Sequence, residues 1–124
     1  MMIDSFAWVE YFMGTEKGEK VREIVESDQV LYTSPVILAE IYSKSQRTDG
    51  RGEERVNFIL ERCAVVELDE EIGLEAGKIH AEMKPKVRDF GMIDALILAS
   101  AKKKGLKVLT GDKHFEHFEN VIML

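Results

Sequence analysis

The sequence predicts an α/β protein, a three-layer α/β/α sandwich with a mainly parallel central sheet of about five strands. Short apolar runs alternate with longer helical patterns along all 124 residues. Strands separated by helices need crossover connections, which favour parallel pairing and helices on both faces of the sheet. No internal repeat or linker divides the chain. We therefore expect a single domain over residues 1–124.

The candidate strands are short apolar or β-branched runs, at residues 1–4, 30–33, 64–68, 107–110 and 120–123. Patterns of helical period fill the gaps, at residues 5–13, 17–26, 35–47, 53–62, 70–83 and 93–104. Pro35 stands near one helix start and Gly105 near a helix stop, where each residue type is favoured. Strands thus alternate with helices from end to end.

Composition indicates an ordinary globular protein, with 45% hydrophobic and 32% charged residues. No apolar stretch approaches the roughly 20 residues that cross a membrane, and no secretory signal opens the chain. The lone Cys63 excludes an internal disulfide and fits a reducing compartment. A net charge of −6 argues against broad adhesion to nucleic acid. We expect a cytoplasmic protein without a membrane partner.

Four acidic residues stand out by position. Glu40 interrupts the apolar run VILAEIY, and Asp94 is the only charge in MIDALILA. A buried carboxylate is costly unless it is paired or binds a metal. Asp4 and Asp112 fall at or just past the ends of two predicted strands, which share one rim of the sheet if they are parallel. We therefore expect one carboxylate pocket.

A cluster of carboxylates is typical of Mg²⁺ or Mn²⁺ sites, which activate water for phosphodiester hydrolysis. Each acid also has a purely structural interpretation. Asp4 and Asp112 could cap a helix or a turn. Glu40 could pair with Lys44 one helical turn later, and Asp94 could pair with a distant base.

At these residues the sequence resembles the PIN-domain family, and most closely its toxin-type, VapC-like ribonucleases. The matching segments are IDSFAWVEYFMG, TSPVILAEIY, DALILASA and LTGDKHF, in family order and spacing. Residues 48–90 carry no motif of the family. The resemblance implies that Asp4, Glu40 and Asp94 hold the principal metal ion, while Asp112 completes the pocket or helps to hold a second cation.

The resemblance further implies an endoribonuclease that depends on Mg²⁺ or Mn²⁺ and cuts RNA through metal-activated water. Members of this type are usually paired with an antitoxin protein and are often homodimers. On this resemblance, Ser5 and Thr110 could hydrogen-bond a carboxylate or a metal-bound water. No protein nucleophile is needed.

A basic stripe could guide RNA away from the pocket. Lys44, Arg47 and Arg51 follow Glu40 at i+4, i+7 and i+11, so they share one face if the helix persists through Gly50. The alternative interpretation is a solvated basic helix end that the macrodipole favours.

Other side chains receive structural interpretations. We expect His114 and His117 to be surface residues of a short helix, since no cysteine supports a zinc site. The aromatic residues of the first helix, Phe6, Trp8, Tyr11 and Phe12, are expected in the core or a dimer contact.

Three other functions compete with the RNA-cutting toxin. A signalling receiver domain is also small, acidic and Mg²⁺-binding, but its acids belong at strand ends, whereas Glu40 and Asp94 fall in helical runs. A catalytically silent PIN-like module would bind RNA or protein without cutting. A DNA-cutting relative would carry additional helical elements, for which this chain has little room.

Overall fold

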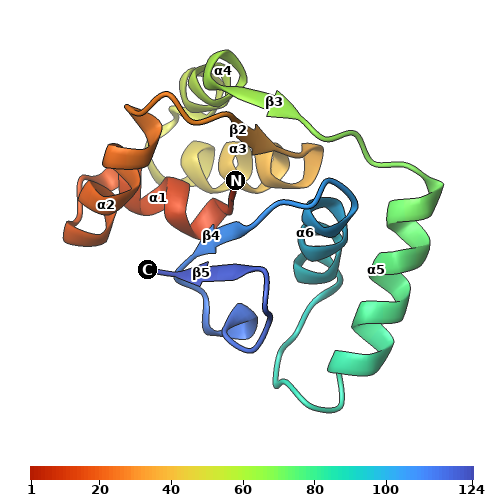
Figure 1. The fold of residues 1–124 in the computed structure, drawn as a ribbon. Helices are drawn as coiled ribbons and strands as arrows, with labels where there is room; N and C mark the ends of the chain where they lie inside the picture. The colour runs from red at the N-terminus through yellow and green to blue at the C-terminus, as the bar shows by residue number, and fades with distance from the viewer.

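The computed structural model describes residues 1–124 and has a five-stranded sheet at its centre (Figure 1). The strands are β1 (Met2–Ile3), β2 (Leu31–Thr33), β3 (Cys63–Val65), β4 (Val108–Thr110) and β5 (Val121–Met123). Their order across the sheet is β3-β2-β1-β4-β5, and every neighbouring pair is parallel. The predicted parallel five-stranded sheet is confirmed, although the strands are shorter than predicted.

The helices are α1 (Ser5–Met13), α2 (Glu16–Val25), α3 (Pro35–Asp49), α4 (Gly52–Arg62), α5 (Glu70–Met83) and α6 (Met92–Lys103), with a 3₁₀ turn, η1, at Lys113–Phe115. The chain steps from β1 to β2 to β3 in one direction and then returns across the sheet to β4. Right-handed crossovers therefore place α1–α4 on one face and α5 and α6 on the other (Figure 1). No helix has both the length and the apolar character needed to cross a membrane.

Helix α3 illustrates how local sequence sets the element ends. Ser34 is the N-cap, and its Oγ accepts a hydrogen bond from the Ile37 N–H at 3.3 Å. Pro35 occupies the first turn, where its missing N–H costs nothing. The helix continues two residues past the predicted end at 47 and stops at Asp49, because Gly50 takes a left-handed conformation with φ of 75°.

The hydrophobic core surrounds the two central strands. Met2 and Ile3 of β1 and Val108 and Leu109 of β4 are almost fully buried. Each such side chain contributes on the order of 2 kcal/mol through burial. The ends of β1 and β4 are therefore held in a fixed register, and the residues that follow them are held with them.

Candidate active site

The point where β1 and β4 end is the topological switch point of the sheet. Asp4 follows β1 directly, and Thr110 is the last residue of β4. The Asp4 N–H donates to the Leu109 carbonyl at 3.0 Å, which holds Asp4 beside the end of β4. The connections leave these two strands toward opposite faces, and such a crevice is the usual ligand site of an open α/β sheet.

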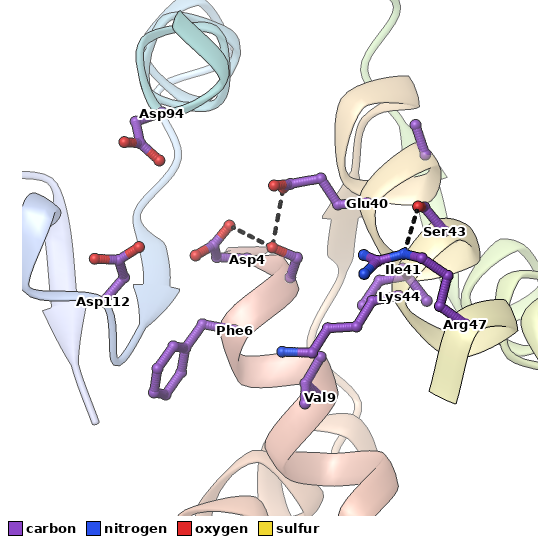
Figure 2. Close-up of a pocket in the computed structure, with 12 residues that line it drawn as sticks. Asp4, Phe6, Val9, Glu40, Ile41, Ser43, Lys44, Arg47, Asp94 and Asp112 are labelled. Carbon is purple, nitrogen blue, oxygen red and sulfur yellow. Dashed lines mark hydrogen bonds between the residues drawn. The ribbon is translucent and has the colours of Figure 1, made fainter. Parts of the chain in front are cut away.

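Asp4 is directed into this crevice and is only 3% exposed. It occupies the N-cap position of α1, yet its side chain makes no capping hydrogen bond, so the capping interpretation does not account for its carboxylate. Instead, Thr110 Oγ1 donates to Asp4 Oδ2 at 2.7 Å. Ser5 Oγ lies 3.5 Å from the other oxygen, Oδ1 (Figure 2).

Glu40 reaches the same crevice from α3. Its Oε1 accepts a hydrogen bond from Ser5 Oγ at 3.0 Å, rather than an ion pair from Lys44 (Figure 2). Ser5 thus lies between the carboxylates of Asp4 and Glu40, at hydrogen-bonding distance from both. Ser5, which was expected to hydrogen-bond a carboxylate, therefore links the start of α1 to Glu40 of α3.

Asp94 belongs to the first turn of α6, where its Oδ2 accepts a hydrogen bond from the Gly91 N–H at 3.0 Å. Asp112 follows β4, and its Oδ1 accepts from the His114 N–H at 2.9 Å, so the capping interpretation of Asp112 is correct for this oxygen. Its own N–H donates to Thr110 Oγ1 at 3.0 Å. Both acids are anchored by backbone groups and face one another across the crevice (Figure 2).

Burial makes the negative charge of this cluster expensive. Burial is the main reason that the pKa values of Asp4, Glu40 and Asp94 all lie above their ordinary range. Repulsion among the acids raises these pKa values further. The only basic side chain within ion-pair distance of the four acids is His114. The donors are mainly carboxylate oxygens, the set that Mg²⁺ and Mn²⁺ prefer, so the residues fit a divalent cation.

The four acids line one cleft of about 470 Å³ (Figure 2). Its walls also include Phe6 and Val9 of α1 and Lys44 and Arg47 of α3. Phe6 was expected in the core or a dimer contact; it does not belong to the hydrophobic core, because its ring forms one wall of the cleft, and the dimer contact stays a prediction. The ring approaches Gly111 so closely that a Cβ there would lie 2.3 Å from Phe6 Cε1. With the Phe6 ring in this position, only glycine fits where the chain leaves β4.

Trp8 differs from Phe6 in being fully buried. It packs at 5.6 Å between ring centroids with both Tyr11 and Phe12, away from the cleft. For these three residues the structural interpretation agrees with their packing.

The structure places His114 differently from the expectation of a plain surface residue. Its side chain is 34% exposed, and Nδ1 lies 3.3 Å from Asp94 Oδ2 and 3.4 Å from Asp112 Oδ1. His117, by contrast, is 72% exposed and adjoins only Glu116. The one trace of this contact in the sequence is the position of His114 two residues after Asp112. Its contact with Asp94 depends on where α6 lies.

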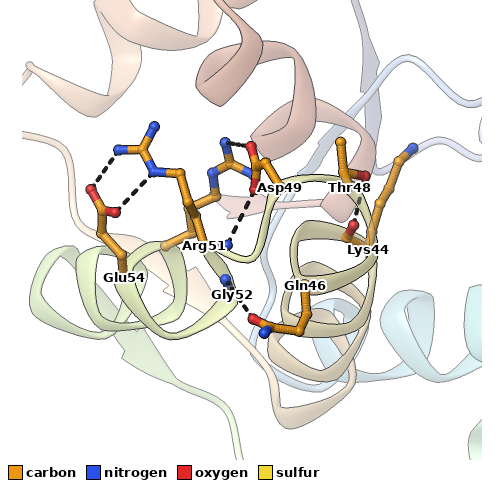
Figure 3. A network of polar contacts seen from close by, with 8 residues as sticks. Lys44, Gln46, Thr48, Asp49, Arg51, Gly52 and Glu54 are labelled. Atoms are coloured by element: carbon orange, nitrogen blue, oxygen red, sulfur yellow. Dashed lines mark hydrogen bonds and ion pairs between the residues drawn. The ribbon is translucent and has the colours of Figure 1, made fainter.

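The basic stripe is shorter than the sequence indicated. Lys44 and Arg47 line the cleft, and Arg47 Nε donates to Ser43 Oγ at 3.3 Å. Arg51 lies beyond the end of α3 and makes two hydrogen bonds to Glu54, at 2.9 and 2.7 Å (Figure 3). The stripe therefore ends at Arg47, since the helix stops before Arg51.

Known protein structures share this fold. A toxin–antitoxin complex from Klebsiella pneumoniae superposes with a TM-score of 0.80 at 19% identity, over 98% of this chain and 95% of that chain. VapBC2 from Rickettsia felis, bound to a DNA fragment from its promoter, gives 0.76 at 17% identity, over 99% and 96%. VapC20 from Mycobacterium tuberculosis, a Sarcin-Ricin loop cleaving toxin, gives 0.76 at 20% identity, over 93% and 92%. A comparison with curated protein sequences finds no significant match.

The sequence itself matches the family model of the PIN domain over residues 1–121. This match includes all four cleft acids, together with the 48–90 stretch in which no motif was visible. Two of the acids lie in helices rather than at strand ends, which is also the feature that disfavoured a receiver domain. Matched over nearly its whole length and built on the same fold as VapC-type structures, the chain belongs to the PIN-domain family.

Proposed function

We propose that this chain is a divalent-metal-dependent endoribonuclease that hydrolyses RNA phosphodiester bonds, acting as a single domain over residues 1–124. The observation that carries the proposal is the set of four acids that line one cleft with no lysine or arginine paired to them. The name of a similar structure, a Sarcin-Ricin loop cleaving toxin, supports the choice of reaction.

In this proposal Asp4, Glu40 and Asp94 hold Mg²⁺ or Mn²⁺, and Asp112 completes the pocket. Such a cation lowers the pKa of a water molecule and offsets the charge that develops on the phosphate. Thr110 fixes one oxygen of Asp4 and leaves Oδ1 for the cleft. A hydrogen bond of this kind orients a ligand and reduces the freedom lost when a cation binds.

Ser5 orients the carboxylate of Glu40 in the same way, through a hydrogen bond to one of its oxygens. Its hydroxyl donates to Oε1 and leaves Oε2 available. Opposite, the Gly91 N–H holds Oδ2 of Asp94, so the first turn of α6 sets the direction of that carboxylate. Each acid thereby reaches the cleft with a restrained side chain, and this preorganisation favours binding.

Lys44 and Arg47 are the proposed RNA contacts. They lie one and two helical turns after Glu40, on the cleft wall. A phosphate chain with one linkage at the acids can therefore place neighbouring phosphates against these two side chains. Local contacts of this kind are compatible with an overall net charge of −6, because only the surface at the substrate must be basic.

We also propose that the chain is the toxin of a toxin–antitoxin pair, acts as a homodimer and works in the cytoplasm. The antitoxin proposal is supported by the toxin–antitoxin complexes whose structures share this fold. An antitoxin protein is then the expected second partner beside RNA.

The test is cleavage of a labelled structured RNA with Mg²⁺, Mn²⁺ or EDTA. We expect cutting with either cation and none with EDTA. Asp94→Asn keeps the side-chain size but removes the charge, and it should lower the rate by about a hundredfold or more. Asp28→Asn removes the same charge from an exposed position outside the cleft and should cut normally.

Cutting that persists in EDTA, or in Asp94→Asn, would contradict the proposal. A wild-type protein that binds the cation but cuts none of several RNAs would instead be the catalytically silent PIN-like binding module.

A further inference from the structure

His114 is the only basic side chain within ion-pair distance of the acid cluster. The turn η1 starts at Lys113, and the His114 N–H donates to Asp112 Oδ1 at 2.9 Å, which fixes the backbone beneath the ring. The ring is half-buried, and its Nδ1 points between two carboxylates from different elements, α6 and the segment after β4. His114 does not itself line the cleft, but this placement puts a nitrogen beside two acids that do.

The spacing of these atoms suits a shared cation. One ligand atom each from Asp94, Asp112 and His114 lie within 4.8 Å of one another. In an octahedral site with bonds near ~2.1 Å, adjacent ligands are about 3 Å apart. The Nδ1 distances of 3.3 and 3.4 Å to the two carboxylate oxygens are close to that value, so small side-chain rotations would bring all three atoms to one ion.

A nitrogen ligand changes which cation the cleft prefers. Mg²⁺ takes oxygen ligands almost exclusively, whereas imidazole nitrogen is a good ligand for transition metals. We infer that His114 is a ligand of the cation held by Asp94 and Asp112, and that it makes the site prefer Mn²⁺ to Mg²⁺. The inference rests on the proposed function, because it concerns the same metal-binding cleft.

The chemistry of binding is simple. Nδ1 donates its lone pair to the cation, so the ring is neutral in the complex and carries its proton on Nε2. Where Nδ1 carries a proton before binding, that proton is released to solvent when the cation binds. Without the cation, the Nδ1–H group can face the carboxylates instead, which explains why the same side chain is held there in the structure.

The test measures cation binding by the full chain and does not depend on cleavage. Mn²⁺ and Mg²⁺ affinities are measured by titration calorimetry for wild type, His114→Ala and His117→Ala. We expect His114→Ala to weaken Mn²⁺ by about tenfold or more and Mg²⁺ much less. His117→Ala removes a histidine that is 72% exposed and should bind both ions as wild type does.

Pulsed electron paramagnetic resonance of the Mn²⁺ complex gives a second readout, since a coordinated imidazole adds a ¹⁴N coupling. The coupling should be present in wild type and absent in His114→Ala. His114→Asp offers an oxygen in its place, so it should retain Mg²⁺ binding without the ¹⁴N signal. Thermal melting of each variant shows that it is folded.

The outcomes separate the inference from the proposed function. Wild-type binding of Mn²⁺ without ¹⁴N coupling, or equal losses for both ions in His114→Ala, would overturn the role of His114 and leave the nuclease proposal intact. A wild-type chain that binds neither ion would overturn both.

Discussion

Two groups of charged side chains lie at opposite ends of α3 and behave in opposite ways. The cleft acids are Asp4, Glu40, Asp94 and Asp112. The turn cluster, where α3 ends and α4 begins, comprises Asp49, Arg51, Glu54 and Arg55. Figure 3 labels the first three. In the cleft three pKa values are raised, chiefly by burial. In the turn cluster each acid has an arginine, with Asp49 2.7 Å from Arg55 and Glu54 2.7 Å from Arg51.

In the turn cluster the pKa values of the two acids, Asp49 and Glu54, are lowered instead of raised. Hydrogen bonds from Arg51 lower the pKa of Glu54. Burial acts to raise the pKa of Asp49, but hydrogen bonds from the Arg55 side chain and the Arg51 backbone outweigh it and leave the pKa lowered. The comparison shows that an acid paired with an arginine of the same chain stabilises the fold. Buried acids that lack such a partner indicate a candidate ligand site.

Asp4→Asn is expected to give the largest effect, a loss of RNA cleavage, that distinguishes the cleft acids from the turn cluster. Cleavage should fall by about a hundredfold or more, because a ligand charge is lost. In EDTA the same variant should be more stable than wild type by about 1 kcal/mol, because the amide avoids a buried charge and can still accept from Thr110. Cleavage assays and chemical denaturation measure the two effects. A destabilised variant would mean that the Asp4 charge already has its partner in the protein.

An intermediate effect is expected for the basic wall. Lys44→Ala and Arg47→Ala should each weaken RNA binding by about tenfold at low salt and reduce the salt slope by about 1. Fluorescence anisotropy in EDTA, at several salt concentrations, measures both quantities. Arg51→Ala removes the same charge from the turn cluster and should leave affinity and slope unchanged. Equal losses in all three variants would indicate attraction by overall charge and not by the cleft wall.

The smallest effect is the pH dependence of stability without metal. The folded pKa values of Asp4, Glu40 and Asp94 lie above their unfolded values of 3.8, 4.5 and 3.8, so the folded protein binds more protons. Stability should therefore decline as the pH rises from about 4 through the raised values. The turn cluster contributes the opposite slope, since its lowered pKa values stabilise the fold above the unfolded values of 3.8 and 4.5, and that stability is lost in acid.

Denaturation in EDTA between pH 4 and 7 measures this slope. Asp94→Asn should flatten it, and excess Mn²⁺ should reverse it, because metal ligands bind deprotonated. An unchanged slope in Asp94→Asn would mean that this acid titrates alike in the folded and unfolded chains.

Much of the fold was predictable because strands and helices alternate cleanly. The predicted helix at 53–62 differs from α4 by a single residue, and the 93–104 helix is shifted by one from α6. The strand predicted at 64–68 failed in part, since β3 covers only Cys63–Val65. Residues 66–68, Val-Glu-Leu, alternate apolar and polar as a strand does, but pairing ends where the neighbouring strand β2 ends at Thr33. A partner's length is not visible in the segment itself.

Residues of the candidate site could be predicted where a charged residue stands within an apolar stretch of sequence. Glu40 and Asp94 are acids within apolar runs, and both line the cleft. His114 carries no such conflict, because a histidine in a polar turn is ordinary, and only the position of α6 beside η1 gives it a role. Arg51 was placed on the basic stripe by regular spacing across Gly50, but the backbone turns left-handed there and the helix ends. Arg51 therefore does not continue the helix face that carries Lys44 and Arg47.

The contact between Phe6 and Gly111 constrains how the sequence can vary. With the Phe6 ring in its present place, a side chain at 111 would collide with it, and the ring would have to leave its position on the cleft wall. A small residue at position 6 would release that restriction, and would also widen the entrance. Positions 6 and 111 are therefore expected to vary together: which residue is tolerated at one depends on which residue occupies the other.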